Sequence, residues 1–251
     1  MKKNYQYLLF ATILLLISLT GVGILSFYDY QKKELPKKQE VKEIEKEEIE
    51  EIEEVVIPYT NEMPNFRTQY SNDNIKARIE VPGVGINSLV TRTNDNNFYL
   101  TNNYYNQRDG LGVPFFDYRN INLEEAKQLN IYGHNTENDQ FKDRLPFIKL
   151  LSFKDKNTFD TKKDIYLYTD IKKIEYEVVA IKITTKNDIT HMQVNFQDSN
   201  DFLNHMNKLL QNTYYKDDFL VVDKDDHFLV LQVCNYEPTD TILLVIAKAK
   251  T

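Results

Sequence analysis

Alternation of apolar and polar side chains runs through most of the chain after residue 66, a period typical of half-buried β-strands. The segments that alternate, or that form short runs rich in β-branched and aromatic residues, are 75–84, 88–91, 113–118, 130–133, 164–169, 174–185, 228–236 and 241–248. Eight strands with few helices predict a mainly β domain, closed or nearly closed as a barrel, because closure removes exposed strand edges. The last two strands are joined by a tight loop and are expected to pair as a hairpin.

Helical periodicity is confined to short segments. Phe202, Met206 and Leu209 recur on one face of residues 201–211, with Ser199 as the expected N-cap. Three further short helices are expected: 123–129, 141–151 with a break at Pro146, and a turn capped by Asp95 that runs to Leu100.

The N-terminal segment has a different pattern. No charged residue occurs between Lys3 and Asp29, and about 20 apolar residues in a helix span the roughly 30 Å of a bilayer core. We therefore expect a cytoplasmic tail (1–6), a transmembrane signal anchor (7–28) and a single-pass protein whose domain 66–251 is extracellular. The alternative, a cleaved signal peptide, requires a shorter apolar region and a small-x-small cleavage site.

An acidic stalk or linker is expected over residues 29–65. Residues 40–54 contain nine Glu and two Lys, a net charge of 2 − 9 = −7. The whole chain has 31 basic and 38 acidic residues, also −7, so the remainder is neutral. The stalk is either a solvated spacer, which its like charges favour, or an amphipathic helix that docks on the domain. No basic cluster indicates a nucleic-acid partner.

The strand from Phe228 ends in Cys234, the only cysteine of the chain, which excludes an intrachain disulfide. Side chains alternate along a strand, so Gln232 and Cys234 share a face while Leu231 and Val233 lie on the other. A lone cysteine is either a small core residue or a nucleophile, and a nucleophile needs a partner that favours the thiolate.

Four histidines could be that partner. His227 lies seven residues before Cys234 on the same strand, about 23 Å away, which excludes it. His191 and His205 lie in or beside a polar, helix-like segment. His134 follows a short apolar strand in a Gly-His-Asn turn, an arrangement typical of a catalytic loop.

Several motifs in order resemble the sortases, the transpeptidases of Gram-positive cell walls, and most closely class B. They are Asp95-Asn96-Asn97-Phe98-Tyr99-Leu100, Gly110–Asp117, Ile131-Tyr132-Gly133-His134-Asn135, the strand ending in Cys234, and Leu244-Val245-Ile246-Ala247-Lys248. The resemblance covers residues 79–250. It implies an eight-stranded sortase-type β-barrel with a helix between the sixth and seventh strands, where the 201–211 helix falls.

The resemblance also implies the chemistry. Cys234 would attack a carbonyl in the C-terminal sorting signal of a secreted protein, and His134 would protonate the leaving amine. A cell-wall precursor or pilin amine would then resolve the thioacyl-enzyme. Asn96, Leu100 and Gln232 would line the signal-binding groove, although capping and core packing explain Asn96 and Leu100 equally well. Gln232 stands where sortases usually carry a small hydroxyl residue. No cofactor or metal site is indicated.

One residue departs from the family pattern. Sortases carry an arginine at the start of the last strand, and Ile242 occupies that position here. Backbone N–H groups with the Thr239 or Thr241 hydroxyl could replace it, or Arg92 or Arg144 could reach in. If neither does, the enzyme is slow or inactive. The runner-up function is therefore a catalytically impaired sortase-like domain that binds sorting signals or wall components. A cysteine peptidase of another fold is a third alternative, although papain-like enzymes place cysteine before histidine in the chain.

Overall fold

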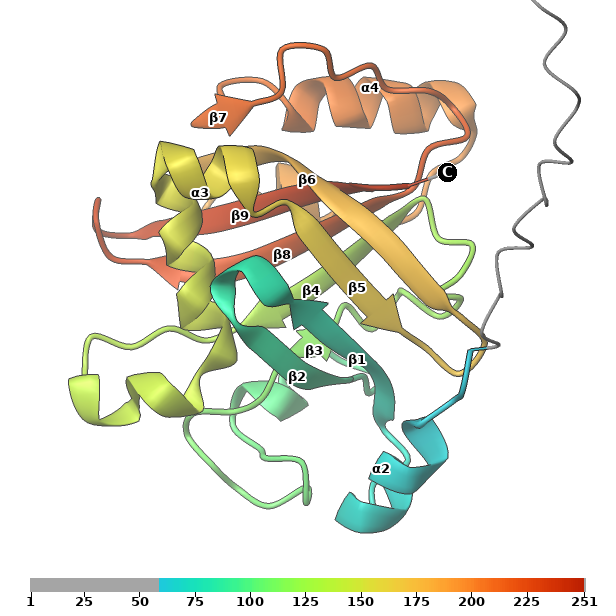
Figure 1. Ribbon diagram of the computed structural model, residues 1–251, viewed down its shortest axis with the longest axis vertical. Helices are drawn as coiled ribbons and strands as arrows, with labels where there is room; N and C mark the ends of the chain where they lie inside the picture. Colours follow the sequence, from blue (N-terminus) through green and yellow to red (C-terminus); the bar gives the residue numbers. More distant parts are fainter. Residues whose placement is uncertain (1–58, 251) are drawn as a thin grey trace, which may run out of the picture. The chain divides into compact units, whose positions relative to one another are not determined.

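One closed β-sheet organises residues 59–250, the part of the chain that the computed structural model describes. Adjacent strands follow the order β5–β1–β2–β3–β4–β8–β9–β6, and β6 pairs back onto β5 (Figure 1). The strands are β1 (Ile75–Val81), β2 (Ile86–Thr91), β3 (Phe115–Phe116), β4 (Gln128–Gly133), β5 (Asp164–Tyr168), β6 (Lys173–Thr185), β7 (Tyr215–Lys216), β8 (Phe228–Asn235) and β9 (Thr241–Ala249).

The predicted mainly β fold is confirmed: eight of these strands form the closed barrel. The ninth, β7, is a two-residue strand on the edge of β6 and was not predicted. The strand expected over 113–118 is limited to β3, which joins β2 through a single residue pair. The last two strands pair as the expected antiparallel hairpin, with Cys234 opposite Ile242.

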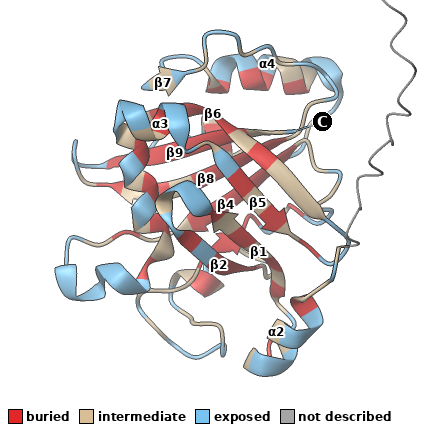
Figure 2. Ribbon diagram, viewed as in Figure 1, coloured by how far each residue is buried: buried red, intermediate tan, exposed pale blue. Residues whose placement is uncertain are grey.

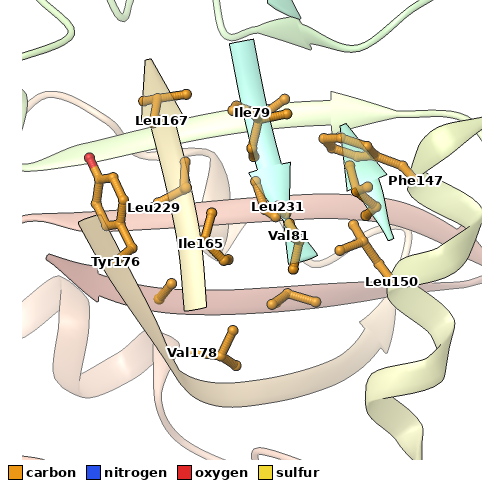
Figure 3. Close-up of a cluster of buried hydrophobic side chains, with 14 of the residues drawn as sticks. Ile79, Val81, Phe147, Leu150, Ile165, Leu167, Tyr176, Val178, Leu229 and Leu231 are labelled. Carbon is orange, nitrogen blue, oxygen red and sulfur yellow. The ribbon is translucent and has the colours of Figure 1, made fainter. Parts of the chain in front are cut away.

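The two faces of β8 separate the core of the barrel from the layer outside it. Leu229, Leu231 and Val233 face the barrel interior, where residues from all sides of the sheet pack together (Figure 3). The alternate residues of β8 face outward and begin a second apolar cluster beneath helix α4 (Ser199–Leu209). That cluster contains Phe202, Met206, Leu209, Phe228, Val230, Ile242, Leu244 and Ile246. Buried residues accordingly line both the barrel and the inner side of α4 (Figure 2).

Two of the predicted helices form with changes at their ends or in their type. Helix α4 lies where the 201–211 helix was expected, but its N-cap is Asp198, whose side chain accepts from the Asp201 N–H, and not Ser199. The expected 141–151 helix forms as two 3-10 helices, η3 (Asp139–Arg144) and η4 (Pro146–Lys154). They are separated at Leu145 because proline disfavours a helical conformation in the residue before it.

The short helix expected over residues 123–129 does not form. Its positions make turns, and β4 begins at Gln128 instead. The Asn120 side chain fixes this entry, because it donates to the Gln128 carbonyl and accepts from the Asn130 N–H, at 2.8 Å each. The few helix-forming residues of 123–129 cannot offset the cost of helix nucleation, because the Asn120 side chain stabilises the start of β4 instead.

The folded part begins before residue 66. Helix α2 (Met63–Tyr70) packs fully buried Met63 against β1, and the Tyr59 hydroxyl donates to the Thr169 carbonyl at 2.5 Å. The tail (1–6), the anchor (7–28) and most of the stalk lie outside the described residues. Between residues 59 and 250, every helix is too short or too polar to cross a membrane. A third α-helix, α3 (Lys156–Thr161), precedes β5.

The packing of Leu231 gives a direct test of the barrel core. Leu231 is fully buried, and Leu231→Ala is expected to lower the free energy of unfolding by about 2–5 kcal/mol, since a cavity replaces the lost side chain. Phe219, which is 96% exposed on the loop after β7, is the control, and Phe219→Ala should change stability by less than about 0.5 kcal/mol. Denaturant unfolding measures both, and equal losses would contradict the assignment of Leu231 to the core.

Candidate active site

Parallel pairing of β4 with β8 brings His134 and Cys234 together. The ladder runs from Gln128 opposite Phe228 to Gly133 opposite Val233, so the next residues, His134 and Cys234, are neighbours on strands about 4.8 Å apart. Val233 faces the barrel interior, and its successor therefore projects from the outer face. Both His134 and Cys234 are half-buried. The predicted catalytic pair thus lies at one end of two adjacent strands.

Hydrogen bonds beyond the ladder fix the two strand ends. The Asn135 carboxamide donates to the Cys234 carbonyl at 2.8 Å, and the Tyr236 hydroxyl donates to the Asn135 carbonyl at 3.0 Å. Burial, together with the neighbouring Cys234, raises the pKa of the Tyr236 phenol. Tyr236 therefore stays neutral and keeps its role as a donor at neutral pH.

The imidazole of His134 is held by a backbone carbonyl. Its Nε2 lies 2.9 Å from the carbonyl oxygen of Leu100, in the 3-10 helix η2 (Phe98–Leu100). A carbonyl only accepts, so Nε2 carries the proton and Nδ1 has the free lone pair. Gly112 makes this arrangement possible: it has φ +59°, and a Cβ there would lie 2.2 Å from the Tyr99 carbonyl oxygen. Only glycine allows the loop to approach η2 so closely.

The structure uses Asn96 and Leu100 to build this segment. The N-cap of η2 is Asn97 and not the expected Asp95, but the Asp95 carboxylate accepts from the N–H groups of Asn97 and Phe98 just before and at the start of the helix. The carboxamide of Asn96 donates to Asp117 at 3.0 Å and accepts from the Tyr118 N–H at 2.9 Å. Leu100 packs against an aromatic cluster formed by Tyr99, Phe115 and Tyr132. Their contact with a sorting signal remains a prediction.

Gln232 lies on the outer face with Cys234, as the alternation predicts. Its Oε1 is 2.6 Å from the Nε2 of His191, which is only 3% exposed and belongs to the 3-10 helix η5 (Thr190–Met192). The sequence indicates only that His191 lies in or beside a polar, helix-like segment. A histidine in the long connection between β6 and β8 gives no local signal that it will reach a residue 41 positions later.

A row of buried polar side chains continues from His134 along the outer face of β4. The row consists of Gln128, Asn130 and Tyr132, and it ends on Asp117, which accepts from the Tyr132 hydroxyl at 2.8 Å. Burial raises the pKa of Asp117, but hydrogen bonds from Arg119, Tyr132 and Asn96 outweigh burial and hold it below its ordinary value. Asp117 is therefore ionised at neutral pH and anchors Asn96 beside the site.

Ile242 and the two candidate arginines are placed differently. Ile242 is 3% exposed and directly opposite Cys234 on β9, so it shares the outer face with the cysteine. The guanidinium of Arg92 donates to the carbonyls of Asn120 and Ile121, away from His134. Arg144, paired with Asp109 at 2.6 Å, lines a cavity of about 290 Å³ that His134 also lines.

The hydroxyls considered as replacements are also placed. Thr241 is 9% exposed, donates to the carbonyls of Pro238 and Asn235, and accepts from the Asn235 side chain, so its hydroxyl is already engaged. Thr239 is exposed on the loop between β8 and β9. In residues 59–250, no group of three or more His, Cys, Asp or Glu is arranged to hold a metal ion.

Comparison with known proteins gives relatives of one kind, although no family model matches the chain. Over 148 residues the chain is 30% identical to Sortase B of Listeria monocytogenes, covering 59% of this chain and 57% of that protein. It is 23% identical to Sortase B of Staphylococcus aureus over 98% of this chain and 97% of that one. The chain thus matches little more than half the length of the Listeria relative.

Solved structures agree with the sequence relatives. The crystal structure of Clostridium perfringens sortase B superimposes with a TM-score of 0.67 at 26% identity, covering 75% of this chain and 99% of that one. The resemblance to class B sortases predicted from the motifs is therefore confirmed.

His205 gives a test of the polar layer outside β4. It is 5% exposed, with its Nε2 2.8 Å from Gln128 Oε1, and burial lowers its pKa from 6.5 to about 4, against the opposing effect of Asp201. Because the unfolded chain binds this proton more readily, stability present above pH 6.5 is lost as the pH falls towards 4.

We expect the free energy of unfolding to fall between pH 7 and pH 4.5, and His205→Gln to reduce that loss by about 1–3 kcal/mol. The glutamine keeps a donor for Gln128 but does not titrate. Denaturant unfolding at the two pH values measures the difference. An identical pH dependence in both proteins would show that His205 does not titrate on unfolding.

Proposed function

We propose that this chain belongs to the class B sortase family and is a cysteine transpeptidase that acts through a thioacyl-enzyme on Cys234. The observation that carries the proposal is the β4–β8 register, which makes His134 and Cys234 adjacent on one outer face of the barrel. A soft nucleophile beside an imidazole that can take and return a proton is the pair that acyl transfer between amines requires.

The roles follow from the contacts. The Cys234 sulfur would attack a carbonyl carbon of the sorting signal, and the C–N bond would break as His134 gives a proton to the leaving amine. Because Leu100 holds the Nε2–H of His134, Nδ1 is the nitrogen that can take the thiol proton and return it. An incoming amine would then attack the thioester carbonyl, lose a proton to the imidazole, and release the Cys234 thiolate.

Stabilisation of the oxyanion is the step with least support from side chains. Ile242 supplies no donor opposite Cys234, so backbone N–H groups near the strand ends, or Arg144 from the cavity beside His134, would have to bind the developing charge. The same observation favours the second candidate function, a sortase-like domain that binds sorting signals with little or no turnover.

The wider setting is also a proposal. Secreted proteins with a C-terminal sorting signal would be the acyl donors, and a cell-wall precursor or a pilin would supply the amine. Residues 7–28 would anchor the protein in the cell membrane as a single span, and the stalk would hold the domain on the extracellular side.

Trapping the thioacyl-enzyme tests the mechanism. The full-length chain, incubated with a peptide library from candidate sorting signals, should gain an acyl mass on Cys234, and hydroxylamine should release that mass as a peptide hydroxamate. Cys234→Ala should abolish the adduct, and His134→Ala should slow hydroxamate release about 10²–10⁴-fold. His227→Ala, at the far end of β8, is the matched control. Binding without acylation would favour the second candidate, and an adduct on Cys234→Ala would remove Cys234 from the mechanism.

Restoring the missing cation tests whether the oxyanion limits the rate. Ile242→Arg is expected to raise the rate of hydroxamate release, by up to about a hundredfold if the guanidinium reaches the oxyanion. Ile242→Met keeps the apolar contact beneath α4 and should leave the rate unchanged. Thermal unfolding confirms that both variants fold. A folded Ile242→Arg protein with no gain would show that the position does not limit turnover.

A further inference from the structure

The connection that carries His191 is fixed against β4. The carbonyl of His191 accepts from the side chains of Asn130 at 2.7 Å and Gln128 at 2.8 Å, and the next carbonyl, of Met192, accepts from Arg119 at 2.7 Å. These carboxamides are themselves buried. The backbone beside Gln232 is therefore held by the barrel itself.

The start of η5 is fixed as well. Asp188 accepts from the Thr190 N–H at 3.0 Å and from the Thr184 hydroxyl at 2.8 Å. Burial raises the pKa of Asp188, but these bonds, with Lys182 nearby, outweigh burial and lower it to about 2. The backbone is thus held on both sides of His191, and the ring of His191 is buried against Gln232.

The hydrogen bond between His191 and Gln232 has a defined polarity. Gln232 Oε1 only accepts, so the facing Nε2 of His191 carries the proton. His191 Nδ1 is then the unprotonated nitrogen, and it is buried without a partner among residues 59–250. Burial lowers the pKa of His191, which keeps the ring neutral. One tautomer therefore holds one end of the Gln232 carboxamide.

The other end of that carboxamide is free to bind. Gln232 is half-buried, and among residues 59–250 its NH₂ group has no hydrogen-bond partner. The buried side-chain nitrogens that lack a partner in that range are Arg78 Nε and His191 Nδ1. The NH₂ group of Gln232 is not one of them and is therefore accessible to solvent. Gln232 is two residues from Cys234 on the same face, about 7 Å along β8. An extended peptide whose carbonyl lies on Cys234 would bring a residue one or two positions away within reach of this donor.

We propose that Gln232 and His191 form a specificity-determining pair, in which His191 orients the Gln232 NH₂ group to donate to an acceptor oxygen of the sorting signal. The pair rests on the proposed function, because it binds the peptide whose carbonyl acylates Cys234. Gln232 contacts the peptide, whereas His191 is a positioning residue. The NH₂ group can only donate, so it selects a residue with a carbonyl, carboxylate or hydroxyl oxygen over an apolar one of similar shape.

The experiment uses the full-length chain, the peptide library with one position randomised at a time, and hydroxylamine as the acceptor. Mass spectrometry of the hydroxamates gives the residue preference at every position. Gln232→Met, which keeps the shape but removes the donor, and His191→Phe should each reduce the preference for oxygen-bearing residues at one shared position about three- to tenfold. His191→Gln places a donor near the former Nε2 and should restore it.

His227→Phe is the matched control, because the Nδ1 of His227 lies 3.0 Å from the Ala126 carbonyl, before the start of β8 and at the opposite end of that strand from Cys234. It should leave the preference profile unchanged. If the acceptor is a backbone carbonyl, Gln232→Met and His191→Phe will raise KM uniformly across the library, and His191→Gln will lower it again.

Two results separate the proposals. Hydroxamates whose profile and KM are unchanged in both Gln232→Met and His191→Phe would overturn the specificity pair and leave the transpeptidase intact. No hydroxamate from the unmodified chain would overturn the proposed function itself. Gln232 is half-buried, so Gln232→Met decides the question even if His191→Phe does not fold.

Discussion

The parallel ladder between β4 and β8 is the constraint on which the site depends. Six consecutive residue pairs fix the two strands in register, and this register joins positions 134 and 234 although a hundred residues separate them. A slip of one residue would turn one of the two side chains into the barrel. Gly133 maintains the end of the ladder, because a Cβ there would lie 2.5 Å from the ring of Phe147.

The outer face of the barrel divides into an apolar and a polar region. Under α4 the surface of β8 and β9 is apolar and is covered by Phe202, Met206 and Leu209. Along β4 the surface is a row of buried polar side chains. The carboxamides of Gln128 and Asn130 donate to a backbone carbonyl of the η5 connection, and the phenol of Tyr132 donates to Asp117. Buried polar groups are costly unless paired, so this row specifies one position for the connection. The site is thus assembled on a rigid outer face of the barrel.

The sequence was most informative where one strand or one motif carried the signal. The alternation of Gln232 and Cys234, the Gly-His-Asn turn and the eight strands all depend on local periodicity. The role of Asn96 in the signal-binding groove stays a prediction. The sequence did not indicate that its carboxamide binds Asp117 and Tyr118, because tertiary contacts decide how an amide is used. The His191 contact could not be foreseen, since it depends on how the η5 segment of the connection between β6 and β8 folds back over β4.

The central claim is the adjacency of positions 134 and 234, and disulfide formation measures it most directly. Cys234 is the only cysteine, so His134→Cys creates a single possible intrachain pair. Neighbouring strands bring Cα atoms to about 5 Å, within the range a disulfide accepts. Mild oxidation should remove two hydrogen masses and leave no free thiol, whereas Arg92→Cys, the control away from the site, should keep both thiols. If His134→Cys also keeps both thiols, the register and the catalytic pair built on it are contradicted.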